Sequence, residues 1–108
     1  MQQADDFVAE SEALHAVLAP LDDAAFDTVT QFKGWTINQV VQHLHFFNRM
    51  VDLALLDPTR FAADYAAFDE VRQIEGSMTG VTNRMLGGLS GQELVAAWRE
   101  RYLEMAAR

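Results

Sequence analysis

The chain has 108 residues, half of them apolar, and a formal net charge of −8 at pH 7. This length fits one domain at most, taken here as residues 1–108, and the apolar content is too high for a disordered chain. So acidic a surface repels phosphate groups. We therefore expect no nucleic-acid partner and no binding to an anionic membrane.

The sequence contains no cysteine, which excludes disulfides, thiolate nucleophiles and thiolate metal ligands. This fits a reducing compartment. The first six residues have no basic region followed by an apolar run, so they do not resemble a signal peptide. No stretch approaches the apolar length of a membrane span. We therefore predict a cytoplasmic protein with no membrane segment.

Helical periodicity dominates the chain, and the first helix is predicted from about Ala4 to Leu18. Pro20 ends it, because proline cannot donate the helical hydrogen bond. Asp22 or Asp23 can cap a short turn that follows. Residues 27–34 are then predicted to form a loop.

The second helix is predicted from about Thr36 to Leu56, with Thr36 and Gln39 at the spacing of a capping box. Its apolar residues form one principal face: Ile37, Val40, Val41, Leu44, Phe47, Val51 and Leu55. Phe46, Met50 and Leu53 form a second strip almost opposite. A helix that is apolar on both sides is usually buried on both, so we predict that a homodimer interface or a further helix covers the second strip.

Asp57 and Pro58 end the second helix and begin a third, with Asp57 as the N-cap. The apolar period then continues at threes and fours. Gly76 and Gly80 predict a break nearby, and Gly87-Gly88 predicts a clear stop. We therefore predict an all-α fold with three main helices and an interrupted helical connection.

Ser90 and Glu93 have the spacing of a second capping box, which predicts the start of the last helix. Its apolar face includes Trp98 and Tyr102. No glycine or proline ends the pattern before Arg108. This favours a domain completed by a further helix or another chain, with residues 1–108 as an N-terminal fragment of a longer protein.

His43 and His45 would share a face on a strand, but on a helix they lie about 200° apart and cannot bind one metal ion together. His43 falls on the apolar flank of the second helix and is the candidate buried or ligating residue. His45 falls on the polar flank, where we expect it to face water or another segment. The helical pattern alone favours a core histidine over a metal ligand at His43.

The segment Gly34-Trp35-Thr36-Ile37, followed by Val40-Val41-Gln42-His43-Leu44, resembles the motif that opens the second helix in the DinB-like group. That group includes the N-terminal domain of mycothiol-dependent maleylpyruvate isomerases. Asp57-Pro58 and Trp98-Arg99 are also similar to the group's pattern, and the resemblance covers most of the chain.

The resemblance implies an up-down four-helix bundle that holds a divalent metal, zinc or nickel, through three side chains. His43 occupies the position of one of these ligands, and Trp35 and Phe47 would be walls of a pocket for a small molecule or a thiol cofactor such as mycothiol. The other two ligands, histidine or glutamate, usually come from a later helix. The resemblance thus implies a metal-binding relative of thiol-dependent isomerases and transferases that is inactive or incomplete as this chain.

A second hypothesis fits the same residues. The chain would be a non-catalytic helical module that dimerises through its exposed apolar strip, with His43 as a core residue. Metal binding that depends on His43 would distinguish the two hypotheses.

Overall fold

The computed structural model describes residues 2–108, and side chains from residue 4 onward. The elements are α1 (Gln2–Leu18), a short 3-10 helix η1 (Asp23–Asp27), α2 (Ile37–Leu56), α3 (Pro58–Glu75), α4 (Met78–Met85) and α5 (Gly91–Ala107). This confirms the all-α prediction. Within residues 2–108, no helix has the length and apolar character needed to cross a membrane.

The long helix α2 is the central element, and it contacts α5, α3, α4 and η1. It begins as predicted: the Thr36 hydroxyl accepts a hydrogen bond from the Gln39 backbone N–H at 3.2 Å. The Gln39 side chain in turn accepts one from the Thr36 N–H at 2.9 Å. The Asp57 carboxylate accepts from the Arg60 N–H at 3.1 Å, so Asp57 caps α3 as predicted.

The break predicted near Gly76 is also confirmed. Gly76 has a φ of 71° and ends α3 in the left-handed conformation, which glycine adopts without steric cost. The Ser77 hydroxyl then accepts from the Gly80 N–H at 3.1 Å and caps α4. Local signals therefore set the ends of α2, α3 and α4.

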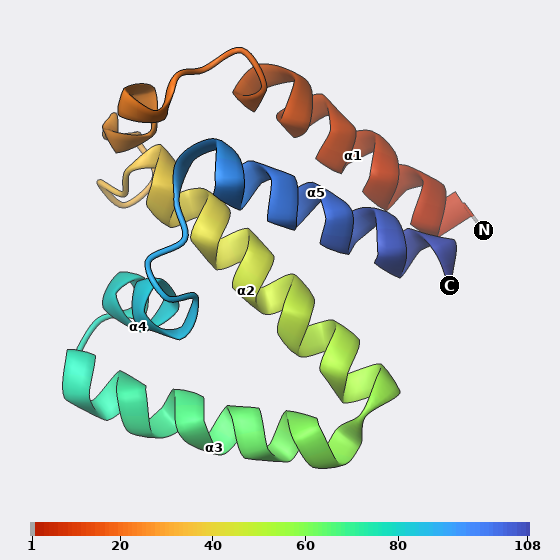
Figure 1. The fold of residues 1–108 in the computed structure, drawn as a ribbon. Helices are drawn as coiled ribbons and strands as arrows, with labels where there is room; N and C mark the ends of the chain where they lie inside the picture. The colour runs from red at the N-terminus through yellow and green to blue at the C-terminus, as the bar shows by residue number, and fades with distance from the viewer. Residues whose placement is uncertain (1) are drawn as a thin grey trace.

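The helices form a flat arrangement measuring 37 × 37 × 22 Å. Figure 1 shows α5 between α1 and α2, so the backbones of α1 and α2 stay apart throughout the described part of the chain. The α3 and α4 helices lie beyond α2. On α2 itself, Leu44, Val51 and Leu55 stay exposed, so part of one side of this helix is uncovered within the described chain.

Two apolar cores flank α2. The first joins it to α1, η1 and α5 and is built on Leu18, Phe26, Val41, Leu94, Val95, Trp98 and Tyr102. The second joins α2 to α3 and α4 and is built on Phe46, Met50, Phe68 and Val81. Between α1 and α5, Glu12 accepts from Arg99 at 2.9 Å and also from the Tyr102 hydroxyl.

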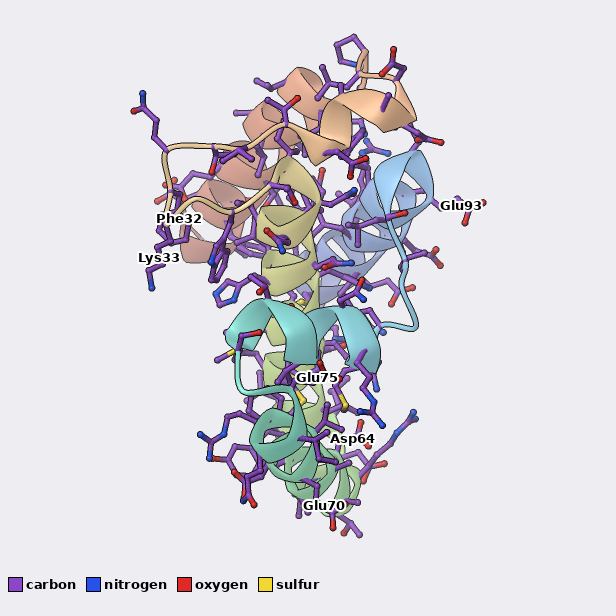
Figure 2. The ribbon with its side chains drawn as sticks, turned by 90° about the vertical axis from the view of Figure 1, so that its left-hand side faces the viewer. Phe32, Lys33, Asp64, Glu70, Glu75 and Glu93 are labelled. Atoms are coloured by element: carbon purple, nitrogen blue, oxygen red, sulfur yellow. The ribbon has the colours of Figure 1, made fainter. Side chains whose placement is uncertain are left out.

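The predicted capping box at the start of α5 is wrong. Ser90 makes no side-chain cap hydrogen bond, and Glu93 projects away from the molecule (Figure 2). Instead, the Asn38 side chain accepts from the Gly91 N–H at 2.8 Å, and Asp23 accepts from the Gln92 N–H at 3.0 Å. Residues distant in sequence therefore satisfy the free N–H groups of this helix.

The structure differs from the sequence-based expectation in which apolar side of α2 is covered. In the second strip, Phe46 is 1% exposed and Met50 is 6% exposed, because α3 and α4 cover them. On the principal face, Val51 is 52% exposed and Leu55 is 77% exposed. The second strip, which was expected to need an interface or a further helix, is thus covered within the chain. The principal face is open only in part, because Val41 near its start is 1% exposed and belongs to the first core.

Candidate site around His43

A tight loop brings Trp35 to the start of α2. Lys33 and Gly34 have φ values of 53° and 71°, so two consecutive left-handed residues reverse the chain. The backbone N–H and the hydroxyl of Thr30 both donate to the Trp35 carbonyl, at 2.7 Å and 2.8 Å. Trp35 therefore has a fixed backbone position immediately before the helix.

The structure brings Trp35, His43 and Phe47 together, the three residues that the family resemblance singled out. The ring centroid of His43 lies 5.4 Å from that of Trp35 and 4.7 Å from that of Phe47. Phe47 is one turn along α2 from His43, so their side chains share a helix face. Trp35 reaches the same imidazole from the preceding loop. His43 is therefore held between two aromatic side chains.

Burial lowers the pKa of His43, and the positive charge of Lys33 lowers it further. The imidazole is therefore neutral at neutral pH. Its Nδ1 is buried, with no hydrogen-bond partner among the described residues. The side chain as a whole is only half-buried, which leaves Nε2 as the nitrogen that a ligand can approach.

Figure 2 shows Lys33 and Phe32 projecting from the loop at the edge of the molecule.

His45 was expected to face either water or another segment. It is 8% exposed and lies against α5, so the second of these alternatives holds. Burial lowers its pKa to about 4, and the charges of Arg101 and Arg49 act in the same direction. His45 is thus the more deeply buried of the two histidines. The helical wheel did not predict that His45 would be the more buried histidine, because α5 packs against the side of α2 that carries the polar residues.

Two further buried polar residues on α2 were missed from the sequence. The Gln42 amide donates at 2.9 Å both to the Asn83 side chain and to the Leu89 carbonyl, joining α2 to α4 and the connection after it. Asp52 is 4% exposed and pairs with Arg101 at 2.9 Å and with Arg108. The sequence did hold one indication of the Asp52 contacts, because the acidic Asp52 on α2 and the basic Arg101 and Arg108 near the end of the chain carry opposite charges.

The described residues do not make a complete metal site. A catalytic zinc site takes three protein ligands, and among residues 2–108 no three His, Cys, Asp or Glu side chains come together in a way that could hold an ion. A ligating histidine also usually donates its second N–H to an acceptor. The buried Nδ1 of His43 has no such partner there. His43 is thus a single potential ligand.

Comparison with protein families identifies the fold's relatives. The family model described as mycothiol maleylpyruvate isomerase N-terminal domain matches residues 7–108. The chain belongs to this family. Membership confirms the resemblance first noted in the Trp35-to-His43 motif. Comparisons with curated proteins and with solved structures return no match.

Proposed function

We propose that this member of the mycothiol maleylpyruvate isomerase N-terminal domain family is related in function to thiol-dependent isomerases and transferases, and that His43 is one ligand position for a divalent metal. The observation that carries the proposal is the neutral imidazole of His43, held between Trp35 and Phe47 at the family's motif position. Neutral imidazole suits zinc and nickel, the two ions implied for this site.

The aromatic side chains support a role in ligand binding. Trp35 and Phe47 are both partly exposed, so each has ring surface available beside the imidazole. Such surfaces would contact the apolar part of a small molecule, for example a low-molecular-weight thiol. Trp35 and Phe47 are therefore the proposed walls of the ligand site.

The proposed site is incomplete as this chain, because one imidazole gives a metal ion only one of the three or more protein ligands it needs. The remaining ligands have to come from outside the described residues. The cytoplasmic location stays a prediction.

Calorimetric titration of the chain with Zn²⁺ or Ni²⁺ at neutral pH tests this proposal. We expect weak binding, far below the roughly 10–16 kcal/mol of a complete structural zinc site. His43→Ala should abolish it. His45→Ala is the matched control, because it lies two residues away on the same helix but on the opposite side. It should leave the binding unchanged because that ring is buried against α5.

Two results would contradict the proposal. Binding that survives His43→Ala would assign the ion to other side chains. Absence of any His43-dependent heat at high metal concentration would favour the second hypothesis, a non-catalytic helical module.

A further inference from the structure

A polar pocket of about 530 Å³ lies between the first half of α2, helix α4 and the connection from α4 to α5. Figure 1 shows these segments, which are far apart in the sequence, meeting on the α4 side of α2. Trp35, His43 and Phe47 do not line it, so it is separate from the candidate site around His43. Apart from Gly80 and Gly88, every described residue of the lining has an amide, hydroxyl or carboxylate side chain. The volume lies within the roughly 300–1,000 Å³ of small-molecule sites.

Gln42 is buried in the wall of this pocket, and its amide is held in one orientation. The side chain is 2% exposed, and its Nε2 donates at 2.9 Å both to the Leu89 carbonyl and to Asn83 Oδ1. Because a carbonyl oxygen only accepts, the amide nitrogen must face Leu89. Gln42 Oε1 accepts no hydrogen bond from the residues that the structure describes. A buried amide oxygen usually has a donor, so this atom is an acceptor available to a ligand.

Neighbouring side chains leave donors free beside this acceptor. Asn83 uses Oδ1 to accept from Gln42, so its Nδ2 is available to donate. Gln39 uses Oε1 to accept from the Thr36 N–H in the capping box, so its Nε2 is available in the same way. The Ser90 hydroxyl caps no helix N–H, and a hydroxyl can both donate and accept. The pocket therefore offers both kinds of hydrogen-bonding group to a ligand.

The charge of the lining favours an uncharged ligand. Among the described residues, no lysine or arginine lines the pocket, and the chain has a net charge of −8. An anion would therefore lose its hydration there without gaining a partner charge. The only ionisable residue in the described lining is Asp27, whose carboxylate accepts from Asn38 Nδ2 at 3.2 Å. One exposed carboxylate that is already hydrogen-bonded gives a cation little stabilisation.

We propose that this pocket binds an uncharged polyhydroxylated small molecule, a sugar or a polyol. Each hydroxyl of such a molecule both donates and accepts, which matches the mixed groups of the lining. One ligand hydroxyl donates to Gln42 Oε1, and others accept from the side-chain amides of Asn83 and Gln39. The proposal goes beyond the metal-ligand position at His43 and does not depend on it, because His43, Trp35 and Phe47 take no part in this pocket.

An NMR titration of the chain with three uncharged probes, D-glucose, sorbitol and trehalose, tests the proposal. The side-chain amide signals report directly on the groups that would contact the ligand. We expect at least one probe to give saturable shifts, largest at the Gln42 and Asn83 amides, with a dissociation constant of about 1 mM or weaker. Absence of saturable shifts with all three probes, or shifts centred on amides outside the pocket, would overturn the proposal.

Asn83→Asp removes a ligand contact while keeping the contact within the fold. An aspartate carboxylate still accepts from Gln42, but the free donor of Asn83 is replaced by an oxygen. Asn83 is exposed, so the variant should keep its helical circular dichroism. We expect its affinity for the probe to fall at least about tenfold.

Asn48→Asp is the matched control, because it adds the same charge to α2 outside this pocket. We expect this variant to bind the probe like the unmodified chain. Full affinity in Asn83→Asp, or equal losses in the two variants, would show that the probe does not occupy the pocket.

Charged counterparts of glucose test the preference for an uncharged ligand. Glucuronate carries a carboxylate and glucosamine carries an ammonium group, and both should bind more weakly than the uncharged probes. Tighter binding of glucuronate would indicate an anion site, and tighter binding of glucosamine would indicate a cation site at Asp27. Either result would overturn the proposed ligand class.

Discussion

Replacement of Trp98 by alanine should lower the free energy of unfolding by about 3–5 kcal/mol, the range for removing a large aromatic side chain from a core. Trp98 is 2% exposed and lies in the core that joins α1 and α5 to α2. Its ring centroid is 4.7 Å from that of Tyr102 in an edge-to-face contact.

Urea unfolding followed by circular dichroism measures this change. Phe32→Ala is the control, because Phe32 is an aromatic residue with 53% exposure on the loop before α2. It should change the unfolding free energy by less than about 1 kcal/mol. Equal losses in the two variants would contradict the assignment of Trp98 to the core.

Acidification should destabilise the fold through His45. Its pKa is lowered from 6.5 to about 4 in the folded chain, first by burial and then by the charges of Arg101 and Arg49. Below pH 6.5 the unfolded chain therefore binds a proton that the folded chain does not bind. The contribution of His45 to the free energy of unfolding is therefore fully present above pH 6.5. It is lost as the pH falls toward 4, by at most about 3 kcal/mol.

The unfolding free energy measured at a series of pH values checks this prediction, and His45→Gln is the comparison variant. Glutamine does not titrate, so the loss of unfolding free energy between pH 6.5 and 4 should shrink in this variant. His43 contributes in the same direction, because its pKa is also lowered. A variant that retains the full slope would show that His45 is not the group responsible.

The ends of the helices could be predicted because short-range chemistry sets them. The Thr36–Gln39 capping box, the Asp57 cap with Pro58, and the left-handed Gly76 each act within a few residues. The cap of α5 could not be predicted in the same way. Its acceptors, Asn38 and Asp23, are more than fifty residues away in sequence and reach Gly91 and Gln92 only in the folded chain.

The buried sides of α2 were harder to predict. A helical wheel identifies apolar stripes, but it does not determine which stripe another helix covers. Here α5 docks on the flank that includes Val41, His45 and Asp52, where Arg101 and Arg108 pair with the Asp52 carboxylate. Pairing between helices therefore decided the burial of this flank, and the more apolar Val51–Leu55 side was left open.

The aromatic surroundings of His43 followed from sequence because all the parts are local. Phe47 lies one helical turn away, and Trp35 is positioned by the loop that leads directly into α2. Further metal ligands, by contrast, depend on residues that no local pattern brings near His43. The proximity of the three side chains therefore has a local cause, whereas the roles of His43 as a metal ligand and of Trp35 and Phe47 as pocket walls stay predictions.

Paramagnetic NMR can show whether His43 is the one metal-ligand position that we propose among the described residues. Co²⁺ would be titrated into a His15→Ala variant, which removes the one histidine outside α2. We expect broadening of imidazole signals that is centred on His43 and weak at the buried His45. Broadening at His45 instead, or none at His43 with Co²⁺ in excess, would contradict it.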